Sequence, residues 1–153
     1  MSLLVLALGL MVLFSYYKPL SLVPNEPLNQ SDPFSAPFTL SNDWYSSIYD
    51  VTYKCRINRI ERSHNRIITN TRVWDSRLSK ESLGYKDKAD LFCPIRQNVS
   101  IDEIITADIS IEISFHIKFM PWARIMPFNF QTAKDDNGKW RWLYSPIVPI
   151  NSN

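Results

Sequence analysis

The sequence predicts an all-β fold, namely an antiparallel immunoglobulin-like β-sandwich of about seven to eight strands preceded by one N-terminal transmembrane helix. Residues 107–119 alternate between apolar and polar side chains, which is the pattern of a strand with one buried and one solvated face. Similar segments recur between turn signals, as in a sandwich or, as a second candidate, a small barrel. Residues 1–17 are uncharged and almost wholly apolar.

The central strand is expected within residues 107–119. Its apolar parity holds Ile109, Ile111, Ile113, Phe115, Ile117 and Phe119. Its polar parity holds Asp108, Ser110, Glu112, Ser114, His116 and Lys118. A helix would distribute both sets around its axis, so the pattern favours a strand of an antiparallel sheet, which can leave one face in water.

The composition limits the chain to one folded domain. A length of 153 residues leaves room for one domain and a tail or an anchor. Ten prolines against three glycines suit a protein of short strands bounded by proline. A net charge of +2 lacks the basic excess of a nucleic-acid-binding surface, so no nucleic acid is expected as a partner.

Residues 1–20 are expected to form a transmembrane anchor or, as an alternative, a signal segment. Tyr16 and Tyr17 followed by Lys18 fit the place where a membrane helix reaches the interface. A cleaved signal peptide would need a basic start and small residues before the cut, and neither is evident. Lys18 does not fix the orientation of an anchor.

The remaining chain divides into three parts. Residues 21–36 combine prolines with Ser and Asn and show no hydrophobic period, which predicts an extended linker that lifts the domain off the membrane. We expect the β-sandwich domain at residues 37–146. A flexible tail is expected at residues 147–153.

Within the domain, the period-two pattern and the turn signals predict the strands in chain order. They are expected at 38–42, 48–57, 67–74, 89–93, 107–119, 128–132 and 140–144. The dipeptide Asn137-Gly138 predicts that the last two form a hairpin. Pro121 and Pro127 are expected to interrupt the chain at a bulge or a switch between sheets.

Cys55 and Cys93 are predicted to form a disulfide. Cys55 lies on the apolar parity of 48–57, and Cys93 ends the short strand 89–93, so both are expected near the core. The pair should be oxidised if the anchor delivers the domain outside the cytoplasm. A cytoplasmic domain would instead carry two buried thiols.

Two surfaces are candidates for binding. A basic stretch offers a patch for an anionic partner, or else a solvated hairpin whose charges discourage edge pairing. The residues of this patch are Lys54, Arg56, Arg59, Arg62 and Arg66. The terminal hairpin offers an aromatic platform, or else core packing between sheets. The residues of this platform are Trp140, Trp142 and Tyr144.

No catalytic residue, metal site or cofactor is expected, and hence no enzyme. Asp108, Glu112 and His116 share the polar face of the central strand, but positions four apart on a strand are separated by about 13 Å. The sequence contains no G-x-S-x-G, P-loop or H-E-x-x-H motif.

Residues 31–94 contain the segments SDPFSAPFTLSNDWYSSIYDVTYKC and DLFCP. Together with the apolar N-terminal segment, they resemble a group of uncharacterised bacterial membrane-anchored proteins with a small exported immunoglobulin-like β domain. The resemblance implies membrane attachment and an immunoglobulin-like sheet domain. It implies no known activity and no catalytic residues.

We therefore expect a non-enzymatic, membrane-tethered extracytoplasmic domain with a structural or protein-interaction role at the cell envelope. The expected location is a bacterial inner membrane, crossed once, with the C-terminal domain in the periplasm or outside. The expected partners are the membrane, through the N-terminal helix, and another envelope protein. The alternative is a carbohydrate- or anionic-lipid-binding module that uses the terminal aromatic hairpin or the arginine-rich hairpin.

Overall fold

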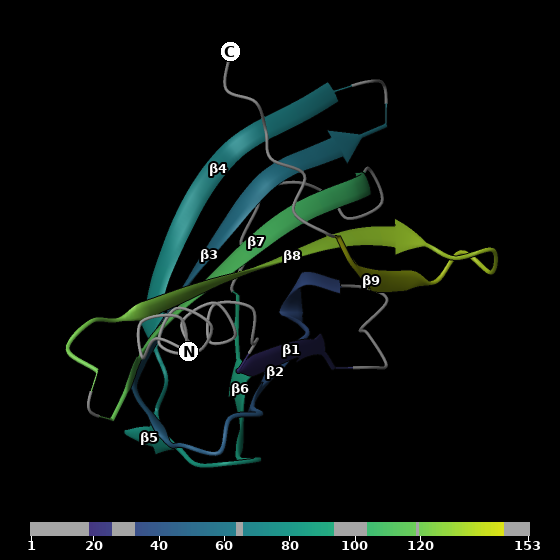
Figure 1. The fold of residues 1–153 in the computed structure, drawn as a ribbon. Coiled ribbons are helices and arrows are strands. Elements are labelled where there is room, and N and C mark those ends of the chain that lie inside the picture. Colours follow the sequence, from purple (N-terminus) through teal and green to yellow (C-terminus); the bar gives the residue numbers. More distant parts are fainter. Residues whose placement is uncertain (1–18, 26–32, 64–65, 94–103, 119, 146–153) are drawn as a thin grey trace, which may run out of the picture.

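The computed structural model in Figure 1 describes residues 19–25, 33–63, 66–93, 104–118 and 120–145. Two antiparallel sheets lie against each other in a sandwich-like arrangement, which confirms the all-β prediction. The small sheet has three strands in the order β1-β2-β6. Within the described ranges, the large sheet has six strands, in the order β4-β3-β7-β8-β9 with β5 paired to β3.

The bounds of the strands are as follows. The small sheet consists of β1 (Leu20–Pro24), β2 (Phe38–Asn42) and β6 (Lys88–Leu91). The large sheet consists of β3 (Ile48–Arg62), β4 (Arg66–Arg77), β5 (Ser82–Leu83), β7 (Ile104–Ile117), β8 (Arg124–Lys134) and β9 (Trp140–Tyr144). A short 3₁₀ turn, η1 (Pro33–Ser35), precedes β2.

The central strand is β7, which pairs with β3 on one side and with β8 on the other. Its apolar side chains from Ile109 to Ile117 are all buried, and its polar side chains are half-buried or exposed. The alternation of the sequence therefore corresponds to the two faces of the large sheet. Phe119 lies outside the described residues.

The core lies between the two sheets, where the inward-facing side chains of both sheets meet. Phe38 of β2 packs against Phe130 of β8 with a ring centroid distance of 4.9 Å. Leu40 and Leu91 of the small sheet and Phe115 of the large sheet are fully buried. Each such side chain contributes roughly 1.5 to 3 kcal/mol by leaving water.

The N-terminal boundary of the domain differs from the predicted one. Residues 20–24, which the sequence pattern assigned to the anchor and to the linker 21–36, form β1 and pair with β2 from Leu20 to Pro24. Phe34 and Ala36 are also buried. Sequence periodicity does not reveal β1, because this strand has only two inward-facing leucines and is bounded by prolines. Pro24 is tolerated because β1 is an edge strand.

Pro127 does not interrupt the chain as predicted. It lies within β8 and pairs with Glu112 of β7. β9 pairs only with residues 130–134, so no described strand pairs with the other edge of β8 at this position. Proline is tolerated within a strand at such a position, because a nitrogen that faces away from the paired strand removes no ladder hydrogen bond.

Most of the predicted anchor lies outside the described residues, which begin at Pro19, and so does the predicted tail at 147–153. Nowhere in the described ranges is there a helix of sufficient length and apolarity to span a bilayer.

Candidate functional site

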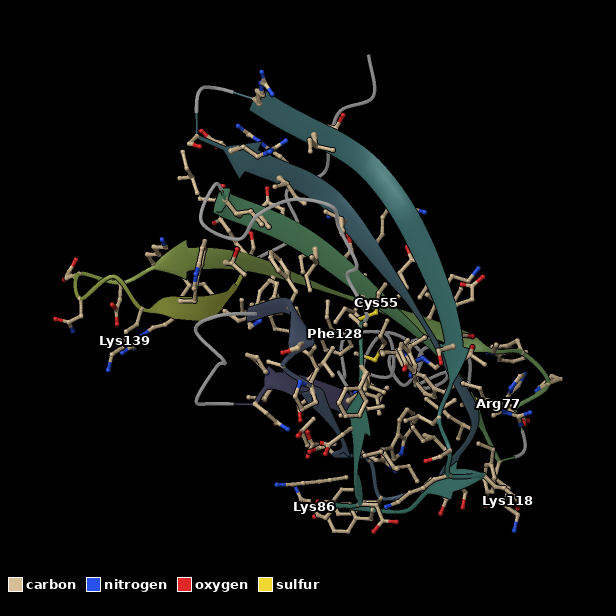
Figure 2. The ribbon with its side chains drawn as sticks, turned by 180° about the vertical axis from the view of Figure 1, so that it is seen from behind. Cys55, Arg77, Lys86, Lys118, Phe128 and Lys139 are labelled. Carbon is tan, nitrogen blue, oxygen red and sulfur yellow. A yellow bond between two sulfur atoms is a disulfide. The ribbon has the colours of Figure 1, made fainter. Side chains whose placement is uncertain are left out.

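Cys55 and Cys93 form a disulfide, as the sequence predicted, with their Cα atoms 5.8 Å apart. Both cysteines are buried. Cys55 lies in β3 of the large sheet, and Cys93 follows β6 of the small sheet, so the bond joins the two layers covalently (Figure 2). Inward parity along β3 gives Cys55 this position.

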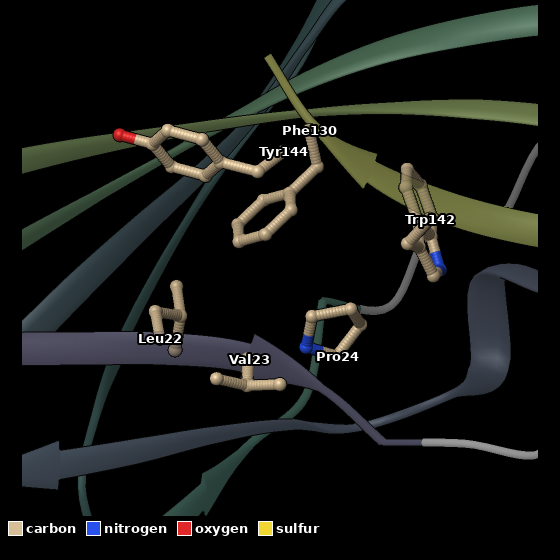
Figure 3. A pocket seen from close by; sticks show the side chains of 6 residues that line it. All are labelled: Leu22, Val23, Pro24, Phe130, Trp142 and Tyr144. Carbon is tan, nitrogen blue, oxygen red and sulfur yellow. The ribbon is translucent and has the colours of Figure 1, made fainter. Parts of the chain in front are cut away.

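A groove of about 510 Å³ opens between the two sheets. Its lining residues are Leu22, Val23 and Pro24 from β1 and Phe130, Trp142 and Tyr144 from β8 and β9 (Figure 3). Val23 and Tyr144 are 58% and 52% exposed and form its rim. Because β1 and β9 are the outermost strands of their sheets, apolar side chains and two strand edges meet here. Such a groove suits an extended apolar segment.

The predicted aromatic platform is mostly core. Trp140 and Trp142 are 4% and 5% exposed, and of the three platform residues only Tyr144 reaches solvent. Trp142 lies 5.6 Å from the ring of Phe38 and 5.8 Å from that of Phe34. The core-packing alternative therefore describes both tryptophans, because the inner parity of β9 faces the small sheet.

A pair of substitutions in β9 tests this assignment. Trp142→Ala should lower the free energy of unfolding by about 3 to 5 kcal/mol, because it leaves a cavity between the two sheets. Leu143→Ala, on the outer parity and 51% exposed, should change it by no more than about 0.5 kcal/mol. Urea unfolding followed by circular dichroism measures both values, and equal costs would contradict the assignment.

The basic residues of the β3–β4 hairpin lie on a face that also carries acids. Lys54 forms an ion pair with Asp75 of β4, with a nitrogen to oxygen distance of 3.7 Å, and lies opposite Glu112 of β7. Arg59 pairs with Glu61 at 3.2 Å and lies opposite Asp108. This face of the sheet therefore carries acidic and basic side chains next to one another.

The three remaining basic residues have no acid directly opposite in the sheet register. Arg56 lies opposite Ser110 of β7. Arg62 and Arg66 lie opposite each other where β3 meets β4, so two basic residues are paired in the register at this tip. Like charges directly opposite are unfavourable in a sheet.

Asp108 is expected to lower the stability of the fold at neutral pH. Burial raises the pKa of this carboxyl above 3.8, while Arg59 lowers the pKa and Glu61 raises it. A carboxyl whose pKa is raised by folding costs stability once the pH rises from 3.8 through its folded pKa. Asp108→Asn should therefore raise the unfolding free energy at pH 7 and leave it unchanged well below pH 3.8.

Urea titrations at several pH values measure the effect of Asp108→Asn. Asp136→Asn, in the exposed β8–β9 turn, is the matched control and should change little at any pH. A gain in stability for Asp108→Asn of equal size at low and neutral pH would contradict the electrostatic explanation.

The structure does not bring Asp108, Glu112 and His116 together as ligands of one ion. In the ranges that the structure describes, no three His, Cys, Asp or Glu side chains are grouped as a metal site requires. Nδ1 of His116 is buried and has no hydrogen-bond partner among the residues that the structure describes. The expected absence of a metal and of a cofactor remains a prediction.

Sequence patterns missed a third surface, which we call the loop end. It comprises the β2–β3 loop (residues 43–47), the β5–β6 loop (residues 84–87) and residues 120–123 before β8. Tyr45, Tyr85 and Trp122 are 82%, 47% and 63% exposed here. The sequence does not indicate that Tyr45 and Tyr85 are neighbours, because they are far apart along the chain. Only the sheet register brings the β2–β3 and β5–β6 loops together.

The buried side chain of Asn42 holds the loop end in place. Its Nδ2 lies 2.9, 2.9 and 3.1 Å from the carbonyl oxygens of Ser46, Leu83 and Gly84, so its two N–H groups donate to all three, with one hydrogen shared between two acceptors. Its Oδ1 accepts a hydrogen bond from the backbone N–H of Trp44 at 3.0 Å. One fully buried amide thus fixes both the β2–β3 loop and the start of the β5–β6 loop.

No protein-family model matches the chain, and no curated protein sequence matches it.

Proposed function

We propose that this chain is a non-enzymatic, membrane-tethered β-sandwich domain that lies outside the cytoplasm and has a structural or protein-interaction role at the cell envelope. The observation that carries the proposal is the buried disulfide between Cys55 and Cys93, which links the two sheets. Structural disulfides persist in oxidising compartments and are rare in the cytosol. The apolar, uncharged residues 1–17 supply a segment suited to membrane attachment.

The order of the strands supports an immunoglobulin-like assignment, as in the bacterial group that residues 31–94 resemble. Immunoglobulin domains place strands A, B and E in one sheet and C′, C, F and G in the other. With β1, β2 and β6 as A, B and E, the small sheet has this order. The large sheet also has the immunoglobulin strand order if β4, β3, β7 and β8 correspond to C′, C, F and G. Strand β9 is then an additional strand beyond G.

The interaction role rests on the groove between β1 and β9. Its floor is apolar, its rim exposes Val23 and Tyr144, and among the described strands β1 and β9 each have a partner on one side only. An extended segment of another envelope protein would bury its apolar side chains in the groove and pair its backbone with one of the edges.

Proteolysis of intact spheroplasts tests the tether and its orientation. Cells expressing the full chain should lose the domain to an added protease, while a cytosolic marker protein remains intact. Survival of the domain until the membrane is lysed would place it inside and reject the proposal.

Photocrosslinking in cells tests the interaction role. A photoreactive amino acid in place of Tyr144 should give discrete protein adducts, because this side chain lies on the groove rim. The same residue in place of Asp136, in the exposed β8–β9 turn, is the control and should give none. Equal patterns at both positions would leave the domain with a structural role alone.

The second candidate is an anionic-lipid- or carbohydrate-binding module based on the arginine-rich hairpin. The observation in its favour is the facing pair Arg62 and Arg66 at the tip. Substituting Arg59, Arg62 and Arg66 by Ser should weaken association with vesicles containing anionic lipid if this candidate is correct. Unchanged association would remove it.

A further inference from the structure

The loop end presents aromatic rings together with a cation. Tyr45 and Tyr85 stack with their ring centroids 4.9 Å apart and an interplanar angle of 26°. Nζ of Lys86 lies 5.3 Å from the centroid of the Tyr85 ring. Trp122 is also exposed and lies two residues before Arg124, whose guanidinium lies over the ring of Trp44 in the β2–β3 loop. Tyrosine, tryptophan and lysine are the side chains that gather at the boundary between lipid headgroups and water.

The described chain begins at the same end of the domain. The carbonyl oxygen of Pro19 accepts a hydrogen bond of 2.8 Å from the backbone N–H of Asp43, and Leu20 pairs with Asn42. The apolar run ends at Tyr17, two residues earlier. Only Lys18 separates this run from Pro19 in the sequence, and two residues span at most about 7 Å, so the chain has no room for a stalk between the run and β1.

Several contacts make the loop end a fixed surface. Beyond the Asn42 amide, Lys86 forms an ion pair with Asp43 at 3.2 Å. The pKa of Asp43 is lowered, first because the Ser21 side chain hydrogen-bonds to it and also because of Lys86. The guanidinium of Arg124 at the start of β8 lies 5.6 Å from the centroid of a Trp44 ring. These contacts link β1, β8 and both loops. Binding to a partner surface would therefore cost little conformational entropy at the loop end.

We propose that the loop end is a membrane-contact surface, which lies on the leaflet that holds the N-terminal segment. Tyr45, Tyr85 and Trp122 lie in the headgroup region, and the ammonium of Lys86 lies at the level of the lipid phosphates. The inference rests on the proposed tether, since the start of β1 brings this end to the bilayer without an intervening stalk. The tip at Arg62 lies at the far end of β3 and faces away from the membrane. Figure 2 shows Lys86 and Lys118 at one end of the domain and Lys139 elsewhere, in the β8–β9 turn.

Site-directed spin labelling of the full chain in lipid vesicles tests the orientation. A nitroxide is attached to Tyr45→Cys at the loop end or to Asn137→Cys in the exposed β8–β9 turn, after confirming that Cys55 and Cys93 remain paired. The Tyr45 label should lose most of its collisions with a water-soluble nickel relaxant when the chain is reconstituted. The Asn137 label should keep them.

The outcomes separate this inference from the proposed function. If the chain does not float with the vesicles in a density gradient, the tether itself is rejected. If it floats and the label at position 45 stays fully accessible to the nickel relaxant, the tether stands and the membrane-contact surface is rejected. Shielding that rises with the ratio of protein to lipid would indicate contact between copies and would also reject it. Shielding independent of this ratio supports the proposal.

Discussion

The double substitution Cys55→Ala and Cys93→Ala should lower the free energy of unfolding by about 3 to 4 kcal/mol. The bond closes a loop with a sequence separation of 38. Loss of the bond raises the conformational entropy of the unfolded chain and so favours unfolding. It also removes the covalent link between the two sheets, which otherwise adhere through side chains such as Phe38 and Phe130. Urea unfolding of the oxidised protein and of the variant measures the difference.

The matched control for this prediction is the unsubstituted protein in a reductant, which loses the bond but keeps both sulfur atoms. It should unfold at nearly the same urea concentration as the double variant. If the double variant and the reduced protein unfold at the same urea concentration as the oxidised protein, the bond contributes nothing to stability. The structural role assigned to it is then wrong.

Asn42→Asp should destabilise the domain by about 3 to 5 kcal/mol at neutral pH, although the two side chains have almost the same shape. The amide donates to three carbonyl oxygens and is fully buried. A carboxylate at this position would direct negative charge at the oxygens of Ser46, Leu83 and Gly84 with no donor of its own. The β2–β3 and β5–β6 loops would then separate.

Asn137→Asp is the control for this chemistry, since it makes the same substitution in the exposed β8–β9 turn. It should alter the unfolding free energy by no more than about 0.5 kcal/mol. Hydrogen exchange adds a local measurement: Asn42→Asp should speed exchange of the backbone N–H of Trp44, Lys86 and Asp87. Unchanged protection at these positions would show that the amide is dispensable for the loop end.

The sequence was sufficient to predict the elements whose pattern is local. Period-two alternation located β3, β7 and β9, and inward parity together with an oxidising compartment predicted the pairing of Cys55 with Cys93. The strand β1 escaped prediction because its alternation is short and follows an apolar run. Its neighbour η1 escaped because the burial of Phe34 depends on the distant ring of Trp142.

The binding surfaces were harder to predict, because they depend on sheet register. Along the chain, the basic stretch contains one acid, but across the sheet Lys54 lies opposite both Asp75 and Glu112. Tyr45 and Tyr85 become neighbours only when their two loops meet at Asn42. Neither arrangement leaves a spacing that could be recognised in one sequence.

We propose that an oxidised cysteine pair joins the two sheets in a domain exposed outside the cytoplasm. Thiol trapping in intact cells tests it most directly: thiols are blocked during acid quenching, disulfides are then reduced, and the new thiols receive a mass tag. The chain holds two cysteines, and we expect both to carry the tag only after reduction. Both cysteines blocked before reduction, in cells that have not been lysed, would contradict the claim.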